Sequence, residues 1–287
     1  MSDYWFDSTF KSDLARKLSI ISSDGTETSL GTYDLFAHDP KGFGLSMKNT
    51  IQQVGTALYL ADSTYSMDNI SFKVIFGSQS RTPYQNYLEF AKIFKGGVVV
   101  LKYMIPGVGV YYRDVVLKSI TKTEMTKDGV LDETFTFEPL SLWYQIAEES
   151  VEISDIYYNY AININIDSNN IFETNFKNNL EITLSADNVS NWAPYWTWMK
   201  NGIVYGDGYN IEMQPGDTII VGNASDNATI AQLRRPSDGT VYDILPYEID
   251  RGVLPVHITD GSNFVTIASN NHNMTVKLIV KVESALI

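Results

Sequence analysis

Three histidines, His38, His257 and His272, are the side chains of this 287-residue chain best suited to exchange protons near neutral pH. They lie far apart in the sequence, and none stands at a metal-ligand spacing such as HxxxH. The chain contains no cysteine, which excludes thiol nucleophiles, disulfides and thiolate-bound metals. We therefore expect structural or solvent-exposed histidines, and neither a metal nor a cofactor.

Carboxylate pairs and serine motifs do not indicate a reaction either. The acids in Asp132-Glu133 and Glu148-Glu149 are adjacent, whereas glycosidase carboxylates must face each other across a cleft. No GxSxG motif occurs, and the GFG run at 42–44 lacks the lysine of a phosphate-binding loop. A hydrolase of unfamiliar layout would need a pocket that joins His38 or His257 to acids. The sequence thus predicts a protein that is not an enzyme.

The segment NWAPYWTWMK, residues 191–200, is the one group of residues that suggests ligand binding. In an extended strand Trp196 and Trp198 share one face, opposite to Tyr195. Two coplanar indoles could form a platform on which a sugar stacks. The alternative is that these rings fill a sandwich core. We take Trp192, Tyr195, Trp196 and Trp198 as a candidate saccharide or partner surface.

The charge balance limits the partners of the chain. Its net charge is −13 and its pI about 4.6, which disfavours direct nucleic-acid binding because that affinity comes largely from Lys and Arg. An acidic surface past which DNA merely slides would still fit. No run reaches the ~18 apolar residues of a membrane span, and the first residues do not form a secretory signal. We expect no membrane insertion, and synthesis in a cytoplasm.

The first half of the chain is predicted to be a β-sheet domain with one packed helix. Residues 70–78 alternate between apolar and polar positions, as a half-buried strand does. A helix is expected within 81–97, because Thr82 can cap it, Pro83 fits its first position, and Gly96-Gly97 ends it. The segment 39–68 contains glycines at 42, 44 and 55 and alternates only in part, which indicates a long arm or hairpin.

The second half is predicted to be almost entirely β. Its candidate strands recur every 8–12 residues between Gly, Asn, Asp and Pro, a spacing typical of an antiparallel sandwich. The boundary falls in FTFEPLSLWY, residues 135–144, where Pro139 ends a strand. We expect domains at 1–146 and 147–287, and the last strand, 274–284, is a candidate to return to the first domain. Phe135, Phe137, Pro139 and Trp143 are the predicted inter-domain joint.

Several turns and strands together resemble a known family. The strand LKSITKTE is followed by a turn and then a Phe-rich strand that ends in Trp143-Tyr144. Later come a P-G-D turn at 215–217, a D-G hairpin at 238–239, and a G-x-N step at 261–263. In this order they resemble the distal tail protein (Dit) family of long, non-contractile-tailed phages that infect Gram-positive bacteria. The resemblance covers residues 17–144 and 150–282.

The resemblance implies a fold and a role. The fold is mainly β: an N-terminal, tail-tube-like β-sandwich with one packed α-helix, and a C-terminal galectin-like β-sandwich. The role is that of a structural hub of the tail tip, or baseplate, assembled in the host cytoplasm. A homo-hexameric ring would join the tail-tube protein to a tail-associated (hub) protein, and the outer domains could carry receptor-binding protein. The alternative is a carbohydrate-binding module that recognises host cell-wall saccharide.

A closed ring gives each subunit two different patches that meet its two neighbours. The weakly charged arm from about Tyr33 to Met67 is our candidate for one patch, because its apolar residues are poorly patterned for a core of their own. The candidate interface residues are Leu45, Met47, Ile51, Val54 and Leu58. The alternative is an ordinary pair of strands.

Overall fold

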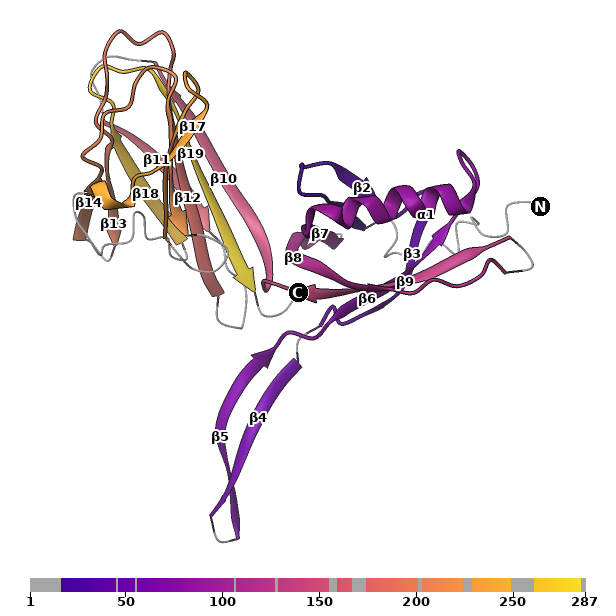
Figure 1. Cartoon of the computed structure of the whole chain (residues 1–287). Coiled ribbons are helices and arrows are strands. Elements are labelled where there is room, and N and C mark those ends of the chain that lie inside the picture. Colours follow the sequence, from indigo (N-terminus) through magenta and orange to yellow (C-terminus); the bar gives the residue numbers. More distant parts are fainter. Residues whose placement is uncertain are drawn as a thin grey trace. The chain divides into compact units, whose positions relative to one another are not determined.

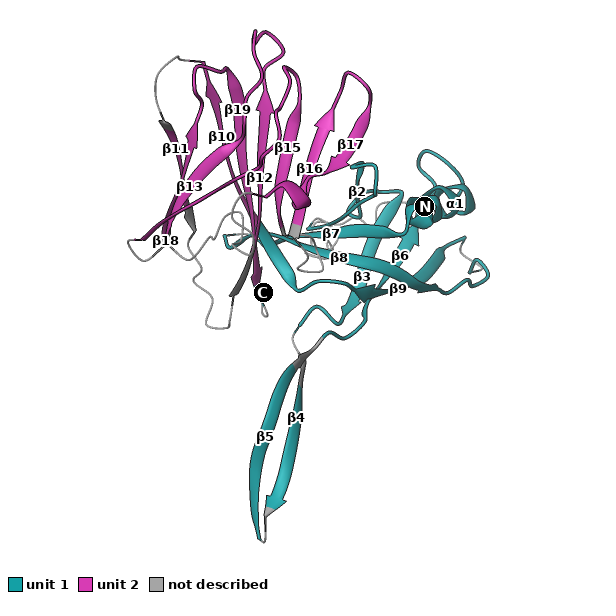
Figure 2. Ribbon diagram, turned by 60° about the vertical axis from the view of Figure 1, so that its left-hand side comes forward, with its two compact units in different colours: residues 1–145, 284–287 teal, residues 146–283 magenta. Residues whose placement is uncertain are grey.

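The computed structural model describes residues 17–44, 46–54, 56–105, 107–126, 129–154, 159–166, 174–200, 203–223, 229–248 and 261–284. The chain forms two compact units: residues 1–145 with 284–287 make unit 1, and residues 146–283 make unit 2 (Figures 1 and 2). The fold is mainly β with one α-helix among the described residues, so the predicted fold class is confirmed. None of the described helices has the length and apolar character to span a membrane.

Unit 1 is built on an antiparallel sheet in the order β2-β1-β7-β8-β9-β6-β3. The strands are β1 (Leu18–Ile21), β2 (Glu27–Ser29), β3 (Leu35–Lys41), β6 (Ile70–Phe76), β7 (Val98–Ile105), β8 (Gly109–Ile120) and β9 (Leu131–Pro139). Leu30 bridges β1 and β3: its N–H donates to the Leu18 carbonyl (3.0 Å), and its carbonyl accepts from the Ala37 N–H (2.9 Å). These bonds connect strands from opposite ends of the order, so the sheet curves around one core.

The core of unit 1 follows from the alternation that the sequence shows. Every second residue of β6, from Ile70 to Phe76, is buried. Helix α1 (Pro83–Lys92) covers this core and continues as the short 3-10 helix η1 (Ile93–Gly96). Its predicted start is confirmed: Thr82 and Gln85 form a reciprocal capping box that satisfies two backbone N–H groups. Phe90 packs edge-on against Phe135, with ring centroids 5.0 Å apart.

Unit 2 is a sandwich of two antiparallel sheets. One has the order β10-β19-β12-β15-β16-β17 and the other β11-β18-β13-β14. The first comprises β10 (Trp143–Ile153), β12 (Thr174–Leu184), β15 (Thr218–Asn223), β16 (Thr229–Arg235), β17 (Thr240–Asp243) and β19 (Met274–Ser284). The second comprises β11 (Asn159–Ile166), β13 (Tyr195–Lys200), β14 (Ile203–Gly208) and β18 (Gly261–Ala268), and the 3-10 helix η2 (Leu245–Tyr247) follows β17. The last strand, β19, thus lies in the sheet of unit 2, and residues 284–287 are grouped with unit 1.

Two buried tyrosines differ in how their hydroxyl groups are satisfied. The Tyr144 hydroxyl donates to Asp114 Oδ1 at 2.7 Å. The Tyr209 ring is fully buried, and its hydroxyl has no hydrogen-bond partner among the described residues. Burial, reinforced by the nearby Asp207, raises the pKa of the Tyr209 phenol. A buried hydroxyl that lacks a partner costs free energy, whereas one that donates to a carboxylate does not.

We predict that Tyr209→Phe leaves the free energy of unfolding unchanged or raises it, because it removes only the unsatisfied hydroxyl. Tyr144→Phe, the matched control, should lower that free energy by about 1–3 kcal/mol, because it leaves a buried carboxylate short of a donor. Urea unfolding followed by fluorescence measures both. An equal loss in the two variants would contradict this account of Tyr209.

Candidate interaction surfaces

The segment predicted to be a long arm is a hairpin. Strands β4 (Ser46–Val54) and β5 (Ala57–Ser66) form a two-stranded sheet of their own and pair with no other described strand. Figures 1 and 2 show the hairpin as a separate ribbon between the ends of β3 and β6. We call residues 46–66 the arm.

One face of the arm is apolar toward its tip. Ile51 pairs with Leu60 and Gln53 with Leu58, so these four side chains lie on the same face. The exposed fractions of Ile51, Leu58 and Leu60 are 62%, 70% and 63%. The opposite face carries Gln52 next to Tyr59. Three large aliphatic side chains therefore face solvent together.

The arm is more polar toward its root. Ser63 donates to the Asn49 side-chain oxygen at 2.7 Å, across the two strands. The register shifts between Thr50 and Ile51, where the polar and apolar halves meet. Of the other predicted interface residues, Met47 and Val54 lie in β4 with side chains outside the described part, and Leu45 lies outside the described residues. Their role in a ring interface stays a prediction.

The residues predicted to form a joint are buried within unit 1. Phe135 and Phe137 are fully buried, and Trp143 is 2% exposed, in the same core as Phe90. Pro139 is also buried and lies opposite Val115 of β8. Trp143 begins β10, the strand along which the chain passes from unit 1 into unit 2. That these residues also fix the position of one domain relative to the other stays a prediction.

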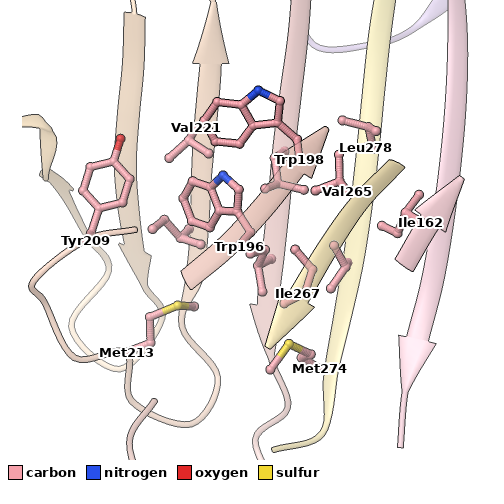
Figure 3. Packing of buried hydrophobic residues seen from close by; sticks show 14 of the residues in the cluster. Ile162, Trp196, Trp198, Tyr209, Met213, Val221, Val265, Ile267, Met274 and Leu278 are labelled. Atoms are coloured by element: carbon pink, nitrogen blue, oxygen red, sulfur yellow. The ribbon is translucent and has the colours of Figure 1, made fainter. Parts of the chain in front are cut away.

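The three tryptophans of the predicted saccharide platform lie in the core of unit 2. Trp192, Trp196 and Trp198 are at most 3% exposed, and Figure 3 shows the latter two among aliphatic side chains. Trp192 Nε1 donates to the Ala268 carbonyl at 3.1 Å. The platform prediction is therefore wrong for these residues, because Trp196 and Trp198 lie on the inward face of β13 and Trp192, which bridges to Met213, is buried in the same core. The core alternative is the one that the structure shows.

Tyr195 lies on the other side of β13, and its exposed fraction is 43%. A side chain at Gly206 would have its Cβ 2.2 Å from the Tyr195 hydroxyl oxygen, so the ring lies across this glycine. From strand alternation, the outer face of the sheet β11-β18-β13-β14 carries no charged side chain among the described residues. This uncharged face comprises Ala161, Asn163, Tyr195, Thr197, Met199, Val204, Gly206, Gly208, Ser262, Phe264, Thr266 and Ala268.

The outer face of the other sheet of unit 2 is charged. Lys277 Nζ lies 2.8 Å from Glu148 Oε1 on this face, whereas the Lys177–Glu283 pair of the same sheet (2.6 Å) is buried. The sandwich therefore has one ionic outer face and one uncharged outer face. Charged residues are depleted at the centres of protein interfaces. The uncharged face is therefore the better candidate for an interaction surface.

The described histidines and Glu133 make local polar contacts. His38 Nε2 lies 3.0 Å from Asp132 Oδ1 on the surface of unit 1. Glu133, the next residue, is fully buried and accepts hydrogen bonds from the Thr123 backbone N–H (2.6 Å) and hydroxyl (3.0 Å). His272 Nε2 lies 2.9 Å from Ser190 Oγ, and His257 lies outside the described residues. No group of three or more metal-binding side chains occurs in the part of the chain that the structure describes.

Comparisons with known proteins agree with the sequence resemblance. Residues 17–140 match the family of the distal tail protein, N-terminal domain. No curated protein sequence matches the chain. A chain of the phage P2 baseplate in its activated conformation with Ca is similar in structure, with a TM-score of 0.65, 16% identity and coverage of 94% of this chain and 99% of that one. The Dit protein of phage SPP1 gives a TM-score of 0.52 and 11% identity over 93% of this chain and 98% of that one.

These comparisons confirm the predicted resemblance. At such identities the two solved structures establish the fold alone. That fold covers both units, whereas the sequence family covers only the first.

We predict opposite outcomes for two adjacent residues of β13. Trp196→Ala should lower the free energy of unfolding by about 3–5 kcal/mol, because it leaves a cavity in the core. Tyr195→Ala should change it by no more than roughly 0.5 kcal/mol, because this ring faces solvent. Chemical denaturation provides the measurement, and a larger loss in Tyr195→Ala would contradict the assignment of faces.

Proposed function

We propose that this chain, which contains a distal tail protein N-terminal domain and has the fold of phage distal tail and baseplate proteins, is a structural hub of a phage tail tip. Six copies form a ring through unit 1. The ring joins the tail-tube protein to a tail-associated protein, and unit 2 presents a surface for a receptor-binding protein. The protein is a virion component that is assembled in the host cytoplasm, and it catalyses no reaction.

The observation that carries this proposal is the exposed apolar face of the arm. A two-stranded hairpin is at best marginally stable in water, and this one shares no sheet with the rest of unit 1. Burying one aliphatic side chain contributes roughly 1.5–3 kcal/mol. Covering Ile51, Leu58 and Leu60 would thus stabilise the arm and bind it to its partner.

A second copy of the chain is the partner that best suits this face. A ring needs two different patches on every subunit, one for each neighbour. The arm supplies one such patch, which unit 1 itself leaves exposed. Contacts of this kind between identical copies form a ring when the rotation from one copy to the next closes on itself.

We predict that the triple variant Ile51→Ser, Leu58→Ser, Leu60→Ser abolishes the hexamer while the melting temperature of the monomer stays the same. These side chains contribute to the contact between copies and hardly to the core of one copy. Size-exclusion chromatography with light scattering measures the mass of the assembly.

The matched control is Thr50→Ser, Gln52→Ser, Tyr59→Ser, which alters neighbouring positions outside the aliphatic cluster. This variant should still form the hexamer. If the first variant still forms a hexamer, the proposed contact through the arm is wrong. If the wild-type protein is monomeric at every concentration tested, the proposed ring is wrong.

A second candidate function is the recognition of a saccharide by unit 2. Its support is the uncharged face, where Tyr195 and Phe264 are 43% and 40% exposed next to Thr and Asn side chains. Exposed rings stack on sugars, and hydroxyl and amide groups can bind sugar hydroxyls. The absence of charge on this face suits a neutral polysaccharide.

We predict that, if unit 2 binds cell-wall polysaccharide, Tyr195→Ala lowers the affinity at least about tenfold, a loss of about 1.4 kcal/mol. The fold should be intact, because Tyr195 faces solvent. Isothermal titration with purified neutral wall polysaccharide measures the affinity, and Val241→Ala on the other sheet serves as the control. No binding by the wild type would exclude this function and leave the hub untouched.

A further inference from the structure

The two chain segments at the root of the arm are in close backbone contact. Gly42, which precedes the arm, has φ +77°, and a Cβ on it would lie 2.1 Å from the Asn69 carbonyl oxygen. Only glycine fits this position, since any side chain would collide with backbone. The arm therefore leaves unit 1 and returns to it at a single narrow point.

The segment entering the arm is held by Trp143. Trp143 Nε1 donates to the Phe43 carbonyl oxygen at 3.2 Å. The Phe43 ring packs edge-on against Tyr103, with centroids 5.4 Å apart, and lies 5.6 Å from the Trp143 ring. One backbone group and one side chain of this segment are thus fixed by aromatic residues of unit 1.

The segment leaving the arm is hydrogen-bonded to Lys118 of β8 and lies within the electrostatic influence of Arg113 on the same strand. Arg113 is 4% exposed, and burial lowers the pKa of its guanidinium to about 10, while the charge of Asp68 opposes this shift. Asp68 and Asn69 lie just after β5, and Lys118 Nζ donates to Asn69 Oδ1 at 3.3 Å. The Arg113 guanidinium also lies 5.6 Å from the centre of the Trp143 ring. Arg113 is thus in contact with the ring that binds the entering segment, and its charge acts on Asp68 of the leaving segment.

The holding residues are themselves well fixed. Arg113 Nε donates to the Ser141 carbonyl at 2.9 Å, and the Asp114 backbone N–H donates to Ser141 Oγ at 3.0 Å. The Tyr144 hydroxyl donates to Asp114 Oδ1. The turn before β10 is thereby locked to β8 on both sides of Trp143. Such support keeps the indole and the guanidinium in one position.

We propose that Trp143 and Arg113 form a clamp that sets the direction in which the arm leaves unit 1, and so positions the aliphatic tip for its contact with the neighbouring copy. The clamp itself rests only on contacts inside one subunit. Its purpose rests on the proposed arm contact. The two residues are positioning residues, and they bind no partner themselves.

The experiment measures the position of the arm in the monomer. Because the chain lacks cysteine, the pair Thr56→Cys and Glu138→Cys accepts one spin label at the arm tip and one on β9. Pulsed electron paramagnetic resonance on dilute protein then gives the distribution of distances between the labels. The wild-type background should give one narrow distribution.

Trp143→Phe keeps an aromatic ring but removes the donated hydrogen bond, and Arg113→Gln removes the cation. Each variant should raise the population of displaced arms roughly fivefold. The matched control is Trp192→Phe, which removes the equivalent indole bond to Ala268 in unit 2 and should leave the distribution unchanged. Circular dichroism confirms that each variant is folded.

Distributions that stay as narrow as the wild type in both clamp variants would overturn the clamp, whether or not a ring forms. Broad distributions in both variants, together with a monomeric wild type at high concentration, would support the clamp and contradict the proposed ring. Broad distributions with a hexameric wild type, and a higher concentration needed for hexamer formation in Trp143→Phe, are the expected result.

Discussion

A β-sheet has to cover its apolar face, and the rest of this structure follows from that constraint. Unit 1 meets it by curving its sheet around one core beneath α1, and unit 2 meets it by packing two sheets together. The arm consists of two strands with no layer to cover them. Its aliphatic residues therefore either remain in water or are covered by another molecule. For this reason the arm is the part of the chain best suited to assembly.

Strand alternation predicted which residues share a face, but it could not predict which face is buried. In β6 the pattern was sufficient, because Ile70, Phe72, Val74 and Phe76 are all apolar. In β13 both faces carry large rings, so Trp196 and Tyr195 were equally plausible as surface residues. Which face of β13 is buried depends on the other sheet of the sandwich, whose strands are distant in sequence. The same holds for Asp132 and Glu133, of which one lies near His38 at the surface and the other is fully buried.

The role of Trp143 illustrates a second limit. Its neighbours in the sequence indicated a strand end at Pro139, which is present, and the Trp143 ring that follows is buried. Its partner, the Phe43 carbonyl, lies 100 residues away in the sequence. No local pattern predicts such a pair, because backbone carbonyls carry no sequence signal. Gly42 was the available clue: a glycine at the start of a long arm indicates that backbones approach closely there.

The length of the arm explains why its root needs a clamp. Strand β4 has nine residues, which at about 3.3 Å per residue makes an arm of roughly 30 Å. A tilt of about 10° at the root then moves the tip by about 5 Å, more than the ~4 Å over which apolar side chains are in contact. The aliphatic residues lie toward the tip, where such an error is greatest. A root that is fixed on both sides reduces the conformational entropy that the arm loses on binding, because the tip is already in position before the next copy binds.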